Sequence, residues 1–146
     1  MTQILTGRDI GQAHYATRAV LERVLTDLGL EFPHSVALNL LGGNDFALAS
    51  DDLRARLENG LKLGEVEVMA VIDGLVSRGL VVLRLENDGR TMVSVTPTGV
   101  ERFNEVQSRT ARFTTRLYAG LPPEDQETTK RLLATLTARA NAELAG

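Results

Sequence analysis

The sequence predicts a mainly α-helical protein that carries one small β-hairpin near the middle of the chain. Three observations lead to this fold class. First, Val68, Ile72 and Leu75 recur at the spacing of one buried helical face. Second, Gly79 follows them and can end the helix in the left-handed conformation that glycine adopts without a Cβ penalty. Third, the hydrophobic period changes from 3.6 to 2 directly after Gly79, so a helix, a hairpin and a further helix follow one another in the plan of a winged helix.

The hairpin is predicted from alternation and from its turn. The apolar residues Val81, Leu83 and Leu85 alternate with Val82, Arg84 and Glu86. A second β-rich run covers residues 92–95, and Asn87-Asp88-Gly89-Arg90 lies between the two runs. Asp-Gly is a strong hairpin signal because both residues tolerate positive φ. A new helix is expected after Thr96-Pro97.

The first two helices have recognisable start and stop signals. Thr6 and Asp9 fit a capping box at the start of a helix that keeps its apolar spacing as far as Gly29. Pro33 is expected as the first residue of a second helix, since its missing N–H would be unpaired there in any case. Gly42-Gly43 ends that helix.

The sequence of residues 46–49 is compatible with either a short strand or a loop. Ser50 is expected to cap a third helix, with Asp51 and Asp52 at its positive end. Asn59-Gly60 is expected to close it.

The two C-terminal helices carry long apolar stripes. The first runs from Val100 to Leu117, and Pro122-Pro123 opens the second, which continues to Leu144. Together with the stripe of the first helix, these faces exceed what one small winged helix can cover, and burying them favours a second chain. Packing within one chain is the alternative.

The order of these segments resembles the multiple antibiotic resistance regulator (MarR) family. The resemblance lies in Leu75-Val76-Ser77-Arg78-Gly79-Leu80-Val81, a polar hairpin, Val95-Thr96-Pro97-Thr98-Gly99 and the run Leu121-Pro122-Pro123-Glu124-Asp125. It implies a single chain over residues 1–146 with a winged helix-turn-helix at 33–99 and dimerisation helices at 6–29 and 97–145. It further implies a homodimer that binds double-stranded DNA as a repressor or activator, tuned by a small aromatic or phenolic ligand.

Composition narrows the kinds of site, compartment and partner that remain possible for this protein. The 146 residues are 43% hydrophobic and 24% charged, and the absence of cysteine excludes disulfides and thiolate metal sites. Two histidines without metal-ligand spacing predict no metal and no cofactor. Neither a membrane-length apolar run nor a basic signal-peptide start is present, so we expect a cytoplasmic protein without a membrane partner. The net charge of −3 argues mildly against nucleic acid unless one basic face exists.

The expected reading face is unusually acidic. Six basic and eight acidic residues lie between Ser50 and Arg90, which leaves a net charge of −2. DNA affinity rests largely on neutralised phosphates, so we predict weak duplex binding. The positions that match the family's base-reading positions are Val66, Glu67, Ala70 and Gly74, none of which donates a side-chain hydrogen bond. Glu67 could accept from a cytosine amino group or could simply be a solvated acid.

The wing also departs from the family, because Asp88-Gly89-Arg90 keeps one arginine of an Asp-Arg-Arg-like turn and is a residue short. Arg84 and Arg90 are candidates for phosphate or minor-groove contacts. Arg54 and Arg56 are expected to supply the rest of the affinity for DNA.

By the same resemblance, five residues are candidates for a ligand pocket: Tyr15, Arg18, His34, Asn39 and Phe113. His14 and Tyr15 can equally be residues of an interface between chains. Two other functions stay open. One is a winged-helix dimer that has lost DNA reading and serves a metabolite or protein partner. The other is an enzyme, with His14, Tyr15, His34 and Asp45 as its candidate residues, although no nucleophile–base pair is readable.

Overall fold

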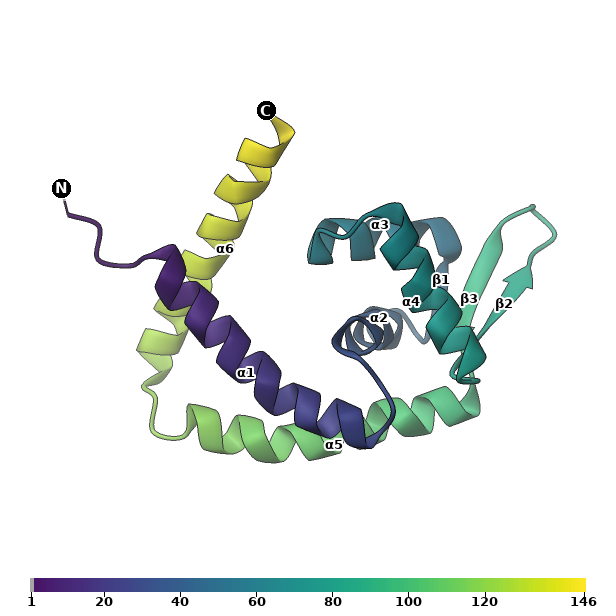
Figure 1. Ribbon diagram of the computed structural model, residues 1–146, viewed down its shortest axis with the longest axis horizontal. Coiled ribbons are helices and arrows are strands. Elements are labelled where there is room, and N and C mark those ends of the chain that lie inside the picture. Colours follow the sequence, from purple (N-terminus) through teal and green to yellow (C-terminus); the bar gives the residue numbers. More distant parts are fainter. Residues whose placement is uncertain (1) are drawn as a thin grey trace. The chain divides into compact units, whose positions relative to one another are not determined.

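The computed structural model describes residues 2–146 and combines helices with one small antiparallel sheet (Figure 1). Its elements are α1 (Gly7–Asp27), α2 (Phe32–Gly42), β1 (Ala47–Ala49), α3 (Ser50–Leu61), α4 (Glu65–Ser77), β2 (Val81–Leu85), β3 (Thr91–Val95), α5 (Pro97–Tyr118) and α6 (Pro123–Ala145). The chain forms two compact units, one ending at Ala111 and one beginning at Arg112, so α5 contributes to both. The predicted helical fold with a hairpin wing is confirmed. Over residues 2–146, no helix combines the length and apolar character that a membrane crossing requires.

Helix α1 begins as predicted. The Asp9 N–H donates to the Thr6 hydroxyl at 3.3 Å, and the Thr6 N–H donates to the Asp9 carboxylate at 2.9 Å. This reciprocal capping box satisfies two backbone donors that the first turn would otherwise leave unpaired. Only Val24 and Leu25, near the end of α1, are buried. Most of the apolar stripe of α1 is therefore not covered within the first unit.

The predicted boundaries of α3 are both wrong. Ser50 is the first helical residue and not the N-cap; that position belongs to Ala49, which is still paired with Met92 in the sheet. At the other end the helix continues through Gly60 and stops at Leu61, where Lys62 adopts a left-handed φ of 57°. The fully buried Leu57 holds the last turn against the core, and this packing outweighs the weak helix propensity of glycine.

The core of the first unit lies between α2, α3, α4 and the sheet. Its fully buried large side chains come from all of these elements and from the end of α1: Val24, Leu25, Leu38, Leu41, Leu53, Leu57, Val68, Leu75, Val81 and Val93. Helix α4 buries its predicted face and ends before Gly79, whose φ of 71° is the left-handed conformation expected there. The helix, stop and hairpin are thus placed as the sequence predicts.

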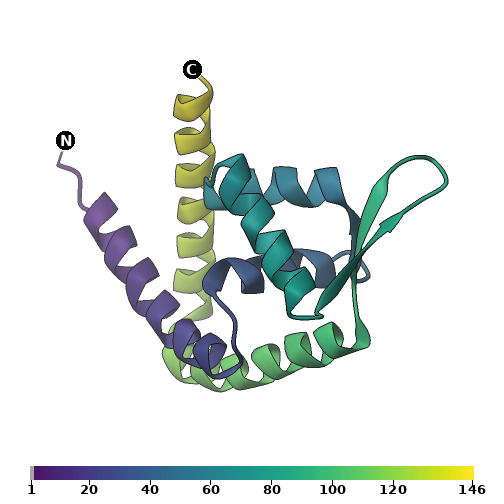
Figure 2. The same ribbon diagram turned by 45° about the vertical axis from the view of Figure 1, so that its right-hand side comes forward.

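The sheet has the strand order β1-β3-β2, and both pairs are antiparallel. Residues 47–49 therefore form a strand, which decides the alternative left open by the sequence. In β2 only the first residue is buried: Val81 is 1% exposed, whereas Leu83 is 48% and Leu85 is 78% exposed. The alternation of β2 does not mark a buried face over its whole length, because the hairpin projects beyond the helices (Figure 2).

The turn between α2 and β1 ties the sheet to two helices. Asp45 and Phe46 have φ values of 55° and 63°, a strained conformation for residues with side chains. The Phe46 ring packs edge-on against Phe103 of α5 at 5.5 Å, and the Phe46 carbonyl accepts from the Val95 N–H at 2.9 Å. Gly42 leaves room for the Phe103 ring, which a Cβ at that position would meet at 2.9 Å. The base of the wing is therefore fixed to α2 and α5 together.

The second unit consists of the end of α5 and the whole of α6. Helix α6 begins at Pro123 after Pro122, as predicted, and none of its residues is buried. Its exposed leucines are Leu132, Leu133, Leu136 and Leu144, with exposed fractions between 37% and 72%.

Candidate functional site

Helix α4 presents one face to the core and the opposite face outward. Gly64 is its N-cap in an extended conformation, and Val68, Val71, Ile72 and Leu75 are its buried residues. The outward face carries Glu65, Val66 and Asp73, of which Val66 is 81% exposed. A helix that is held in this way, next to an exposed hairpin, can enter the major groove of duplex DNA.

Three of the four predicted reading positions, Val66, Glu67 and Ala70, are exposed on α4. Glu67, Ala70 and Gly74 also border a cleft against α2. A Cβ at Gly64 would meet the Glu67 carboxylate at 2.7 Å, so this side chain turns back over the start of the helix. Its negative charge thereby lies close to the positive end of the helix dipole.

Two of the four basic candidates are engaged with neighbouring acids. Arg54 bonds Asp51 at 2.8 Å, and its guanidinium lies 3.5 Å from the sulfur of Met69. In the wing, Arg90 Nε lies 3.1 Å from an oxygen of Asp88. A phosphate must compete with a carboxylate for each of these arginines.

Arg56 and Arg84 complete the set of basic candidates. Within residues 2–146 neither forms a salt bridge, and Arg84 lies on β2 with its side chain exposed. Arg78 is close to the same face but is used inside the protein, because it donates to the carbonyls of Gly29 at 2.8 Å and Gly74 at 2.9 Å. Of the four basic candidates, Arg56 and Arg84 are therefore the two without a salt bridge among residues 2–146.

One predicted ligand residue of α1, Arg18, contacts Phe32, a residue that the sequence does not single out, and His14 contacts the same ring. The Arg18 guanidinium lies 4.2 Å from the centre of the Phe32 ring and also forms a salt bridge with Glu22. The His14 ring packs edge-on to Phe32 at 6.1 Å and lies 5.6 Å from Tyr15. The sequence signal for this contact is an aromatic residue directly before Pro33, at a helix start that follows the end of α1 closely.

The other predicted ligand residues lie elsewhere. Asn39 is exposed on α2, and Phe113 belongs to the second unit, where Arg116 lies 5.0 Å from its ring. His34 is 5% exposed and contacts neither Tyr15 nor Arg18 by ring or hydrogen bond; it faces α4 instead. Arg18 and His14 thus share Phe32 as a neighbour, and Tyr15 contacts His14, whereas His34 faces α4.

His34 is held in a defined state by its surroundings. Helix α2 starts at Phe32, one residue before the predicted start, with Glu31 as N-cap. The Glu31 N–H donates to His34 Nδ1 at 3.0 Å. Burial lowers the pKa of His34 below its usual value of 6.5, and the nearby Arg78 lowers this pKa further, against a smaller opposing effect of Glu31. The ring is therefore neutral at pH 7.

No arrangement suited to catalysis joins the candidates for an enzyme. Asp45 lies in the turn after α2, while His14 and Tyr15 lie on α1 and His34 faces α4. Among residues 2–146, no three His, Asp or Glu side chains are placed to hold a metal ion.

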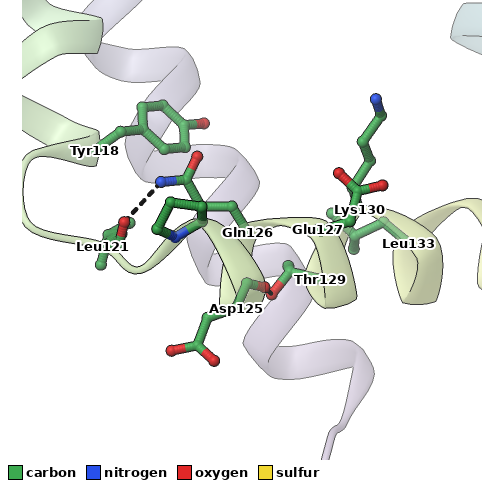
Figure 3. A pocket seen from close by; sticks show the side chains of 9 residues that line it. Tyr118, Leu121, Asp125, Gln126, Glu127, Thr129, Lys130 and Leu133 are labelled. Carbon is green, nitrogen blue, oxygen red and sulfur yellow. Dashed lines mark hydrogen bonds between the residues drawn. The ribbon is translucent and has the colours of Figure 1, made fainter.

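The second unit contains an open groove at the turn from α5 to α6, with a volume of about 740 Å³. Tyr118, Leu121 and Leu133 give it an apolar lining, and Asp125, Glu127 and Lys130 add charges of both signs (Figure 3). The Gln126 amide donates to the Leu121 carbonyl at 2.8 Å and fixes the turn. An apolar groove beside the exposed leucines of α6 is typical of a face that packs against another helix.

Comparison with known proteins identifies the fold. No family model and no curated protein sequence matches the chain. Among solved structures, a MarR-family transcriptional regulator from Rhodococcus sp. RHA1 is 18% identical, with a TM-score of 0.73 over 93% of this chain and 96% of that one. NadR in complex with 4-hydroxyphenylacetate is also 18% identical, with a TM-score of 0.75 over 94% and 96%.

BpsR of Bordetella bronchiseptica, whose DNA binding is regulated by 6-hydroxynicotinic acid, is 19% identical with a TM-score of 0.73 over 91% and 93% of the two chains. The likeness extends over nearly the whole of each chain, including the helices outside the winged helix. The fold is therefore that of the MarR-type winged-helix transcriptional regulators.

Proposed function

We propose that this protein is a ligand-responsive transcriptional regulator that binds duplex DNA as a homodimer, through a reading face that is more acidic than usual. The observation that carries the proposal is the combination of an exposed α4 with a projecting hairpin wing, in a chain similar to DNA-binding regulators over more than 90% of its length. Two of these neighbours are named with a small hydroxylated aromatic acid. A ligand of related size is the effector proposed for this chain.

The dimer is proposed because, among residues 2–146, the terminal helices bury little of their apolar faces. Helix α6 has no buried residue, and α1 buries only two. Pairing of two chains through these helices would cover the leucine faces and place two copies of α4 about one turn of DNA apart. A solution mass near 15.9 kDa by light scattering at micromolar concentration would contradict this assembly, whereas twice that mass is expected.

DNA binding is tested by selection of bound duplexes from a random pool, followed by fluorescence anisotropy at several salt concentrations. We expect binding at low salt that weakens steeply as salt rises, because the affinity rests on a few arginines. The Arg56→Gln, Arg84→Gln double variant is expected to lose most of it, while the Arg131→Gln, Arg139→Gln double variant in α6 serves as a charge-matched control. If wild-type protein selects no duplex at low salt, the protein is not a DNA-binding regulator.

A further inference from the structure

The outer strand of the hairpin has one edge without a neighbouring strand. Strand β2 lies at the end of the order β1-β3-β2, and among residues 2–146 it pairs with β3 alone. The hairpin projects beyond the helices, and Leu83 and Leu85 are 48% and 78% exposed (Figure 2). An edge of this kind can add a strand from another molecule.

The hydrogen bonds of the hairpin decide which backbone groups face this open edge. The Glu86 N–H donates to the Arg90 carbonyl at 2.8 Å, so Glu86 bonds toward β3. In an antiparallel pair, residues that bond the neighbouring strand alternate with residues that do not. The backbone N–H and C=O groups of Leu83 and Leu85 therefore point to the open edge.

A second copy of β2 can pair with this edge in three antiparallel registers, because an outward residue must face an outward residue. With Leu83 opposite Leu83, Arg84 lies opposite Val82. With Leu83 opposite Leu85, Arg84 lies opposite the Arg84 of the other copy. With Leu85 opposite Leu85, Arg84 lies opposite Glu86, and the two-fold axis produces this pair of opposite charges twice.

The charges favour the third register. Opposite charges directly across two strands stabilise the pairing, and like charges destabilise it. Within residues 2–146 neither Arg84 nor Glu86 forms a salt bridge, and Arg90, opposite Glu86 in the hairpin, is bonded to Asp88 at 3.1 Å instead. The same register brings together the two copies of Leu85, the most exposed apolar residue of β2.

We infer that the wing is a self-association surface, in which β2 pairs with β2 of a second copy in the antiparallel register that sets Leu85 against Leu85 and Arg84 against Glu86. The pairing does not depend on DNA binding. It uses a different surface from the terminal helices, so a homodimer of the proposed kind would carry two wings and could be joined to others in a row.

The paired area is small. Two strands of five residues bury far less than the about 1,200 Å² at the lower end of stable interfaces. The association is therefore weak and depends on protein concentration. Sedimentation equilibrium of the full chain, from low micromolar to near-millimolar concentration, should show a weight-average mass that rises at least twofold.

Exchange of the two charges tests the register. Arg84→Glu and Glu86→Arg each set like charges opposite one another at two places, and each should weaken the association by about tenfold or more. The double variant Arg84→Glu, Glu86→Arg restores the attraction and should bring the affinity back to within about threefold of wild type. Arg56→Glu makes the same charge change on an exposed residue of α3 outside the wing, and it should leave the association within about twofold.

The absence of cysteine from the chain allows a second measurement. Leu85→Cys places one thiol opposite its own copy, at a Cα separation of about 5.5 Å that a disulfide can span. The two copies of residue 83 would lie about 13 Å apart along the strands, because they are four positions out of register. In a glutathione redox buffer, Leu85→Cys should form cross-linked pairs and Leu83→Cys should not.

Four results would each overturn the pairing. They are a mass that does not change with concentration, a rise in mass that the single wing variants leave unaltered, a double charge variant that stays as weak as the single ones, and cross-linking through position 83 instead of 85. Failure of this inference is distinct from failure of the proposed function. If a duplex binds while the wing does not associate, the regulator stands; if the wing associates with the expected variant effects while no duplex binds at low salt, the pairing stands alone.

Discussion

Replacing Asp88 by asparagine should increase the affinity of the wing for duplex DNA. Arg90 Nε lies 3.1 Å from Asp88 Oδ2, and the Arg90 N–H donates to Asp88 Oδ1 at 3.0 Å. Asparagine keeps an oxygen for the backbone bond of the turn, but it no longer holds the guanidinium by charge. Both side chains are more than half exposed, so the ion pair is worth about 0.2–1 kcal/mol.

The size of the effect follows from two contributions. Phosphate binding no longer breaks the ion pair, and one negative charge no longer repels the DNA backbone through screened solvent. Together these contribute about 0.5–1 kcal/mol, which corresponds to about two- to fivefold in the dissociation constant. If the released arginine reaches a phosphate, the slope of log K against log salt should steepen by about 0.9.

The assay is fluorescence anisotropy with one duplex over a series of salt concentrations, for wild type, Asp88→Asn and Glu101→Gln. Glu101 is exposed on α5 and is not part of the hairpin, and Glu101→Gln changes the net charge by the same amount. An Asp88→Asn variant with unchanged affinity and salt slope would refute the idea that Asp88 withholds Arg90 from DNA. A control that gains as much affinity would show that only net charge matters.

Three further outcomes are expected. The double change Glu65→Gln and Glu67→Gln should raise DNA affinity several-fold in the same assay, because it removes two carboxylates from the first turn of α4; abolished binding would instead make these acids readers of bases. The free energy of unfolding, measured in urea, should fall as the pH drops below about 6.5. The reason is that burial lowers the pKa of His34 in the folded protein, so the unfolded chain binds more protons in this range. His34→Gln should remove this part of the pH dependence. Gly99→Ala should lower the same free energy by about 2 kcal/mol or more, because its Cβ would lie 2.1 Å from the Leu80 carbonyl oxygen, and an unchanged urea midpoint would contradict that clash.

Most of the fold could be predicted because local signals and tertiary packing agree. The Thr6–Asp9 capping box and the left-handed Gly79 depend on a few neighbouring residues, so the sequence contains all the information they need. Ser50 was misplaced for the opposite reason. The residue before it is held in a sheet by β3, more than forty positions later in the chain, and no local pattern reveals that pairing.

The candidate site was predicted less completely, since its contacts are long-range. His34 was assigned to a pocket with Tyr15 and Arg18, but it faces Gly74, forty residues away, whose missing side chain gives it room. Phe32, which contacts Arg18 and His14, cannot be singled out from the sequence, because one aromatic residue before a proline has no spacing pattern. The net charge of −2 over residues 50–90, in contrast, is readable directly, because charge counts do not depend on the fold.

The open edge of the sheet has a consequence for solubility. Strand β2 pairs with β3 alone, and the Glu86 N–H donates to the Arg90 carbonyl, so alternation directs the backbone groups of Leu83 and Leu85 outward. An apolar strand with free N–H and C=O groups invites pairing with another molecule, and a charge within the strand is the usual protection. Arg84 is the only charge in β2. Removing it for a DNA-binding experiment therefore also removes a gatekeeper against aggregation, and glutamine is a safer replacement than an apolar residue.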